Sequence, residues 1–140
     1  MTKKLVETSE LFSIKNSKNN PTKLYVFGEN FQQQGTDYPG GGQACIRGTE
    51  NAFGFCTLNA IGDYWTDKKY VDNINQVEKD IKALHKMAED FDTIVFPKYG
   101  LGTGRAFCQK NCPKTFVYIC RRLIDEFGFN NIEFLQVPNF

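Results

Sequence analysis

Two glycine-rich segments contain most of the residues that could bind a ligand. Of the twelve glycines, seven lie within residues 28–54 and three within residues 100–104. Each segment follows a short apolar run, residues 24–27 or 93–96, that is typical of a buried strand. Glycine lets a backbone approach a ligand closely and present its N–H groups, and ligands of open α/β sheets bind beyond the carboxyl ends of the strands. The pattern therefore predicts a cleft formed by the two segments.

The first segment predicts an anion site. It begins with Gly28, Glu29 and Asn30 and continues to the triple glycine Gly40, Gly41 and Gly42, which is followed by Gln43. The triple glycine leads directly into a predicted short helix, whose free N–H groups and positive dipole end would face the cleft. No Lys or Arg occurs within residues 24–46, so backbone dipoles must supply most of the positive charge, with help from Arg47, Lys98 and Arg105.

The second segment suits a phosphate. Gly100, Gly102 and Gly104 alternate with Leu101 and Thr103, an arrangement that surrounds a phosphate with N–H donors and one hydroxyl. The chain has no Gly-Lys-Ser/Thr ending here, and the second segment lacks the Gly-x-Gly-x-x-Gly spacing, which disfavours nucleotide phosphotransfer. The alternative is that both segments are only tight turns between elements, because a single glycine-rich turn is a weak signal.

The elements that position these segments follow an alternating pattern. Apolar residues at steps of three and four, with Asn75 and Glu78 as a capping box, predict a helix over residues 75–90. Pro113 begins and Gly128 ends a second predicted helix over residues 113–127. Strands are expected at residues 11–14, 24–27, 53–58, 93–96 and 132–135, with residues 15–23 as a linker. Strands that alternate with helices indicate an α/β fold around a parallel or mixed sheet.

Length and composition predict one globular domain. The chain has 140 residues, 41% of them hydrophobic, and a formal net charge of +1. We expect a single domain over residues 1–140, in which residues 1–22 are an N-terminal strand and linker. No run of about 18 apolar residues and no signal-peptide pattern is present, so we expect a cytoplasmic protein without a membrane partner. The near-neutral charge argues against nucleic-acid binding.

The five cysteines are expected to be reduced thiols without disulfides. Cys108 and Cys112 lie four residues apart, which is a spacing that metal ligands can have. No second pair accompanies them, and the only histidine, His85, lies on a predicted helix elsewhere in the chain. We therefore expect no metal and no cofactor.

Taken together, these residues resemble the macro domain, a family that binds ADP-ribose and its derivatives. The resemblance rests on Asn30 after a buried strand, on the triple glycine, and on a strand ending Ile-Val-Phe-Pro before Gly-Leu-Gly-Thr-Gly. It covers about residues 23–127, and the chain is also similar to short phage and bacterial proteins with a Phe-Gly-x-Asn start. The resemblance implies a three-layer α/β/α fold with a mixed central sheet, and a nucleotide lying across the strand ends.

The resemblance also assigns roles to residues. It implies that Asn30 contacts the distal ribose, that residues 40–42 flank that ribose and the diphosphate, and that residues 100–104 wrap the diphosphate. Phe107 would take the place of an aromatic residue that follows the second loop in the family. The acidic residue that selects adenine in the family has no obvious counterpart before Leu24, and residues 31–38 form an unusual loop. The full expected ligand-binding set is Gly28, Asn30, Gly40, Gly41, Gly42, Gln43, Gly100, Leu101, Gly102, Thr103, Gly104, Arg105 and Phe107.

Hydrolytic macro domains position a water with an asparagine and an acid or base, and here the candidates are Asn30, Glu29 and Asp37. The expected function is binding of ADP-ribose or a related NAD-derived nucleotide, with or without hydrolysis of a terminal ADP-ribosyl or phosphate bond. If the chain is viral, it would act on a nucleotide signal in the host cytoplasm. The alternative is a protein-interaction module without catalysis, indicated by the few catalytic candidates and by thirteen phenylalanines, some of which could form a contact patch.

Overall fold

The computed structural model describes residues 5–38, 40–104 and 106–129, which form a three-layer α/β/α fold. The strands are β1 (Leu5–Ser9), β2 (Lys23–Asn30), β3 (Ala52–Leu58) and β4 (Thr93–Pro97). They form one sheet in the order β1-β4-β2-β3, and every described pair is parallel. The described sheet is thus parallel where the resemblance implied a mixed one. The strand predicted at residues 132–135 lies outside the described residues.

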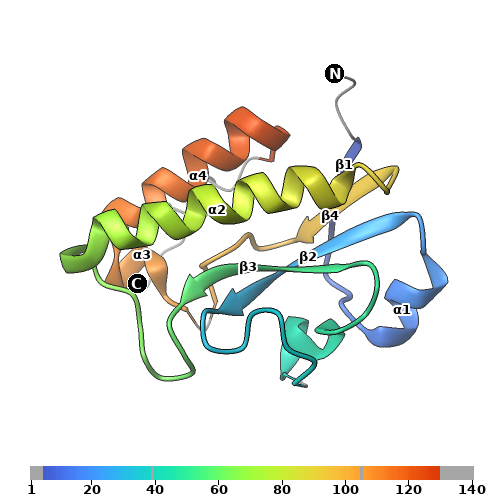
Figure 1. Cartoon of the computed structure of the whole chain (residues 1–140), viewed down its shortest axis with the longest axis horizontal. Coiled ribbons are helices and arrows are strands. Elements are labelled where there is room, and N and C mark those ends of the chain that lie inside the picture. Colours follow the sequence, from blue (N-terminus) through green and yellow to red (C-terminus); the bar gives the residue numbers. More distant parts are fainter. Residues whose placement is uncertain (1–4, 39, 105, 130–140) are drawn as a thin grey trace.

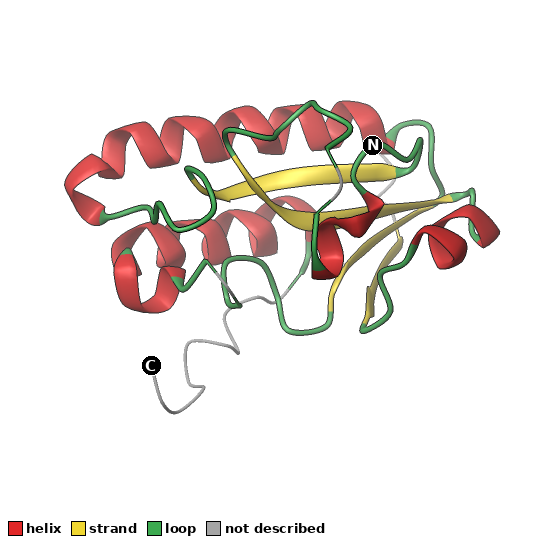
Figure 2. Cartoon of the chain, turned by 90° about the horizontal axis from the view of Figure 1, so that it is seen from below, coloured by secondary structure: helices red, strands yellow, loops and turns green. Residues whose placement is uncertain are grey.

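Helices cover both faces of the sheet (Figure 1). The two long helices, α2 (Tyr70–Ala88) and α4 (Pro113–Phe127), pack together on one face. The other face carries α1 (Ile14–Asn19) and a 3₁₀ turn, η1 (Gly42–Ile46), and Figure 2 views the molecule from this side. Two one-turn elements, η2 (Asp67–Lys69) and α3 (Cys108–Asn111), precede the long helices. No helix in the described part of the chain is long and apolar enough to cross a membrane.

The central strand β2 explains the layers, because it is buried on both sides. Leu24 and Val26 point into the core beneath α2 and α4, whereas Tyr25 and Phe27 point into a second core beside η1. Side chains alternate between the two faces of a strand, so a continuous apolar run requires cover on both faces. The predicted strands at residues 24–27, 53–58 and 93–96 are therefore confirmed.

The two long helices were predicted with different success. The helix α4 has Pro113 in its first turn, and Gly128 ends it in the left-handed conformation, with φ 71°. Both signals act as predicted. The helix α2 begins at Tyr70, five residues before the predicted start, so Asn75 lies inside the helix and the capping-box prediction is wrong. The turn η2 leads directly into this earlier start, where Asp72 complements the positive end of the helix dipole.

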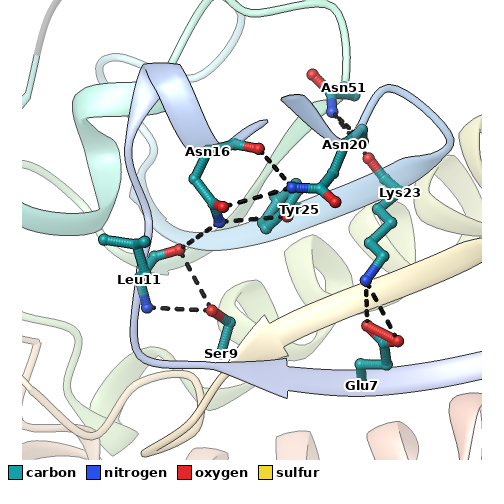
Figure 3. A network of polar contacts seen from close by, with 8 residues as sticks. All are labelled: Glu7, Ser9, Leu11, Asn16, Asn20, Lys23, Tyr25 and Asn51. Carbon is teal, nitrogen blue, oxygen red and sulfur yellow. Dashed lines mark hydrogen bonds and ion pairs between the residues drawn. The ribbon is translucent and has the colours of Figure 1, made fainter. Parts of the chain in front are cut away.

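The N-terminal region differs from the prediction. Residues 11–14 do not form a strand, and the expected linker at residues 15–23 contains α1, which Ser13 caps by accepting a hydrogen bond from the N–H of Asn16. The first strand is instead β1, at the edge of the described sheet. The Asn51 side-chain amide holds this region by donating to the carbonyls of residues 17, 20 and 23. Lys23 also forms an ion pair with Glu7, which Figure 3 shows beside Asn20 and Asn51.

Candidate functional site

The two glycine-rich segments leave neighbouring strands at the same edge of the sheet. β2 and β4 pair directly and in parallel, so their carboxyl ends point the same way. The chain leaves β2 toward η1 on one face and leaves β4 toward α3 and α4 on the other (Figure 1). Connections that diverge to opposite faces open a crevice between the two strand ends, which is where open α/β sheets bind ligands. Residues 28–30 and 98–104 lie at these two strand ends, the position at which such a crevice is expected.

The ladder between β2 and β4 is short and stops before either strand ends. The two strands pair only from Lys23 opposite Thr93 to Tyr25 opposite Val95. Pro97 ends β4, and proline has no N–H to donate to a neighbouring strand. Beyond this point the N–H of Gly28 is bonded to the side-chain carbonyl of Gln43, at 3.3 Å, instead of to β4. Gln43, which follows the triple glycine, is therefore joined to the end of β2 by a hydrogen bond within the protein.

The second segment forms a tight loop whose shape depends on glycine. Gly100 and Gly102 have φ angles of 84° and 78°, a region that residues with a side chain rarely adopt. A Cβ atom at Gly102 would also lie 3.1 Å from the Sγ atom of Cys108. The Thr103 hydroxyl donates to the carbonyls of residues 99 and 100, at 2.6 and 3.2 Å. This hydroxyl braces the loop from within, and Leu101 anchors it in the core.

Phe107 is the one residue other than glycine with a positive φ among those the structure describes, at 46°. It lies at the N-terminus of α3, just after the second segment, and its side chain is 44% exposed. A left-handed conformation costs a residue with a side chain about 1–2 kcal/mol, and such strain accumulates at functional sites. Arg105, the other residue expected here, lies outside the described residues.

The triple glycine plays two roles. A Cβ atom at Gly40 would lie 2.5 Å from the Cβ of Ala44 and 3.1 Å from Nη1 of Arg47, so this glycine packs against η1. Gly41 and Gly42 are exposed, and nothing lies within 4 Å of the position that a Gly42 Cβ would take. Of the three glycines, only Gly41 and Gly42 are therefore open to a ligand.

Glu29 is a buried strand residue rather than a solvated loop carboxylate. Its side chain is 1% exposed and forms a bidentate ion pair with the guanidinium of Arg47, which is 4% exposed. The same carboxylate accepts a hydrogen bond from the N–H of Asn30, at 2.9 Å. Arg47 also donates to the carbonyl of Tyr38, at 2.5 Å. The positive charge of Arg47 is therefore already paired, which removes it as a source of charge for a bound anion.

Asn30 is also bound internally. Its side-chain amide donates to Gln33 Oε1 at 2.7 Å, and its side-chain oxygen accepts from the N–H of Gln33 at 2.9 Å. The side chain is buried at the start of the turn that follows β2. In this structure it closes that turn, and a ligand contact through the same atoms would have to replace these bonds.

A family profile matches residues 7–122, and the description of that family is a family of unknown function, DUF7831. The chain belongs to DUF7831. Neither the curated proteins nor the solved structures contain a match to it.

In this DUF7831 protein, Asp37 lies apart from the crevice. It is exposed and packs against Gly48, where its Oδ1 atom would lie 2.9 Å from an added Cβ. Together with Glu29 it lines an open cavity of about 500 Å³ beside β3, between residues 31–37, residues 47–49 and α2. The structure thus divides the three catalytic candidates: Asn30 lies at the end of β2, and both carboxylates line a different cavity.

Sequence reasoning missed Asp80, which is buried in the wall of this cavity. Its carboxylate accepts hydrogen bonds from the side chains of Gln34 and Gln76 and from the N–H of Cys56. Burial raises the pKa of Asp80, although the hydrogen bonds from Cys56 and the two glutamines act in the opposite direction. The burial of Asp80 could have been predicted from the sequence, because Asp80 falls between Val77 and Ile81 on the apolar stripe of the DUF7831 helix α2.

The chemistry available at the crevice is that of hydrogen-bond donors and an aromatic ring. The N–H of Gly28 is bonded to Gln43 and that of Gly100 to the carbonyl of Pro97, at 3.0 Å, whereas Gly102 and Gly104 carry no side chain and the exposed Phe107 follows them. The acid next to Asn30, Glu29, is paired. Among the described residues, no group of three or more His, Cys, Asp or Glu side chains could hold a metal ion.

Proposed function

We propose that the chain binds an ADP-ribose-type nucleotide in the crevice between β2 and β4. The observation that carries this proposal is that two glycine-rich segments begin at adjacent parallel strands whose connections diverge to opposite faces. A diphosphate would lie against the N–H groups of the second segment, near Gly28 and Gln43. The exposed ring of Phe107, whose backbone has a positive φ, would then stack on a sugar or base.

The geometry favours binding over turnover. A general base must reach the proton that it removes, and the carboxylate of Glu29 is held by Arg47 and by the N–H of Asn30. The side chain of Asn30 is engaged with Gln33. Asp37 lines the cavity beside β3. Hydrolysis of an ADP-ribosyl or phosphate bond would require one of these groups to rearrange, so the proposal is a binding protein.

We also propose that the protein is located in the cytoplasm. All five cysteines are free thiols, four of them buried, as is typical of a reducing compartment.

Titration of the ¹⁵N-labelled protein with ADP-ribose, ADP and ribose 5-phosphate tests the proposal. We expect amide shifts at Gly28 and at residues 100–104 with ADP-ribose and ADP, and weaker binding of ribose 5-phosphate. Gly104 is exposed with nothing within 4 Å of an added Cβ, so Gly104→Glu should abolish binding by charge repulsion without unfolding the chain. Lys86→Gln, at the C-terminal end of α2, makes the same change in net charge and should bind normally. If none of the three compounds shifts those amides, the proposal fails.

A protein-interaction role is the second candidate, and one observation favours it. Several large apolar side chains are exposed in the loops that follow β2, β3 and β4, and these residues are Phe31, Tyr38, Ile61, Tyr64, Tyr99 and Phe107. Exposed apolar residues gathered at one edge of a domain are a common feature of contact surfaces. A partner that binds wild type and Gly104→Glu equally well, and loses binding in Ile61→Asp, would support this candidate over nucleotide binding.

A further inference from the structure

The side chain of Gln43 occupies a backbone donor of the proposed nucleotide site. Its carbonyl oxygen accepts the hydrogen bond of the Gly28 N–H, at 3.3 Å, near the end of β2. The oxygen of Gln43 therefore stands where an oxygen of the proposed diphosphate would have to bind. We propose that Gln43 is a latch, a side chain that closes this donor in the free protein and that a nucleotide phosphate displaces. This inference rests on the proposed function and adds a regulating residue to it.

The bond between Gln43 and Gly28 is easy to open. Gln43 is exposed, and the bond joins a single side-chain atom to the backbone at the protein surface. Its length of 3.3 Å lies beyond the usual range of about 2.7–3.2 Å for such a bond. By contrast, the buried side chain of Asn30 makes two shorter bonds to Gln33, at 2.7 and 2.9 Å. A ligand can therefore replace the bond of Gln43 at little cost to the fold.

The chain around Gln43 allows this side chain to move while the element behind it stays in place. Gly41 and Gly42 precede it and are exposed, and a Cβ atom at Gly42 would meet nothing within 4 Å. Ile46, at the other end of η1, is fully buried in the core beside Tyr25 and Phe27. The displacement is thus confined to residues 41–43, and η1 remains anchored.

A phosphate competes better for the Gly28 N–H than the latch does. The side-chain oxygen of Gln43 is neutral, whereas a phosphate oxygen is charged, and a hydrogen bond to a charged acceptor is roughly twice as strong as a neutral one. A nucleoside without a phosphate has no such oxygen to offer. The latch therefore favours ligands that carry a phosphate, and its removal should benefit only those ligands.

Two substitutions of Gln43 should change affinity in opposite directions. Gln43→Ala removes the competing oxygen, so calorimetric titration should show about fivefold tighter binding of ADP and ADP-ribose, and unchanged affinity for adenosine. Gln43→Glu presents a carboxylate to the same N–H at neutral pH. It strengthens the closing bond and repels phosphates, so it should weaken ADP binding by about tenfold or more. Gln32→Ala is the matched control, because Gln32 is an exposed glutamine in the turn after β2, and its affinities should equal those of wild type.

The Gly28 amide reports on the latch without any ligand. Its proton should exchange with solvent faster in Gln43→Ala than in wild type, and equal exchange rates would overturn the proposal. ADP that binds Gln43→Ala no more tightly than wild type would also overturn it, and weaker binding would make Gln43 a ligand contact instead. The nucleotide site itself would survive either of these affinity results. If neither wild type nor Gln43→Ala binds ADP or ADP-ribose, the proposed function fails and the latch fails with it.

Discussion

Glu29 and Arg47 form a bidentate ion pair from which water is almost excluded, with side chains 1% and 4% exposed. The pair joins the end of β2 to the segment after η1. Through its bond to the Tyr38 carbonyl, Arg47 also holds the chain that leads into the triple glycine. The two residues that the sequence offered as a catalytic acid and as a source of positive charge are thus engaged with each other. Their role is to position the first glycine-rich segment.

Breaking this buried pair should be costly. Glu29→Gln leaves the guanidinium of Arg47 buried without a counter-charge, and the loss of one partner of a buried pair costs about 3–5 kcal/mol. The matched control is Glu78→Gln, because Glu78 also makes a bidentate pair with an arginine, Arg122, but is 43% exposed. That change should cost less than about 1 kcal/mol. Urea unfolding of both variants measures the difference, and equal losses would contradict the assigned role of burial.

Asp80 should give the protein a distinctive pH dependence. Burial raises its pKa in the folded state above the ordinary value of 3.8. The folded carboxyl therefore holds its proton more tightly than the unfolded one, and its contribution to stability is largest below 3.8 and falls as the pH rises through the folded pKa. Asp80→Asn cannot titrate. The free energy of unfolding of wild type minus that of the variant should decrease between about pH 3 and about pH 7, and a difference that rises with pH would contradict this reasoning.

The fold could be predicted from the sequence where an apolar pattern was long or where a strand was buried on both faces. The central strands and α4 follow from apolar runs and from Pro113 and Gly128. The strand β1 was missed because an edge strand needs little apolar surface, and Leu5 is 62% exposed. The helix α3 has only four residues, and packing beneath Gly102 rather than any sequence period specifies it.

The strand ends that carry the two glycine-rich segments were predictable from the sequence, but the charge pairing beside them was not. Glycines after apolar runs indicated the strand ends correctly, because parallel strands share one carboxyl edge. The burial of Glu29 depended on Arg47, which is 18 residues away along the chain. The burial of Glu29 could have been predicted in part from strand alternation. Tyr25 and Phe27 point into the second core, and Glu29, two residues further along, points to the same face. The partner of that carboxylate, however, is set by the path of residues 37–47, which no local pattern encodes.

Thiol chemistry should distinguish Cys45 from the other four cysteines. Cys45 is half-buried, and its Sγ atom donates to the carbonyl of Phe12 at 3.2 Å, whereas the other thiols are buried. Burial raises the pKa of Cys56, and the hydrogen bond with Cys112 and burial raise that of Cys108. Thiolates are the reactive species. We expect a disulfide reagent at neutral pH to modify about one thiol in the native protein and all five after denaturation. Cys45→Ser should abolish the native reaction, and rapid modification of several thiols would contradict the buried packing.

Phe107 should show a trade-off between stability and ligand binding. Its φ of 46° is unfavourable for a residue with a side chain, so Phe107→Gly should raise the free energy of unfolding by about 1 kcal/mol. The same change removes the exposed ring beside the second segment, and loss of one stacking ring should weaken ADP-ribose binding about tenfold. Phe107→Tyr keeps both the ring and the strain, so its stability and its affinity should match those of wild type. Urea unfolding and calorimetric titration measure the two effects separately. A Phe107→Gly variant that is stabilised but binds ADP-ribose as tightly as wild type would assign the strain to the fold alone and remove Phe107 from the proposed site.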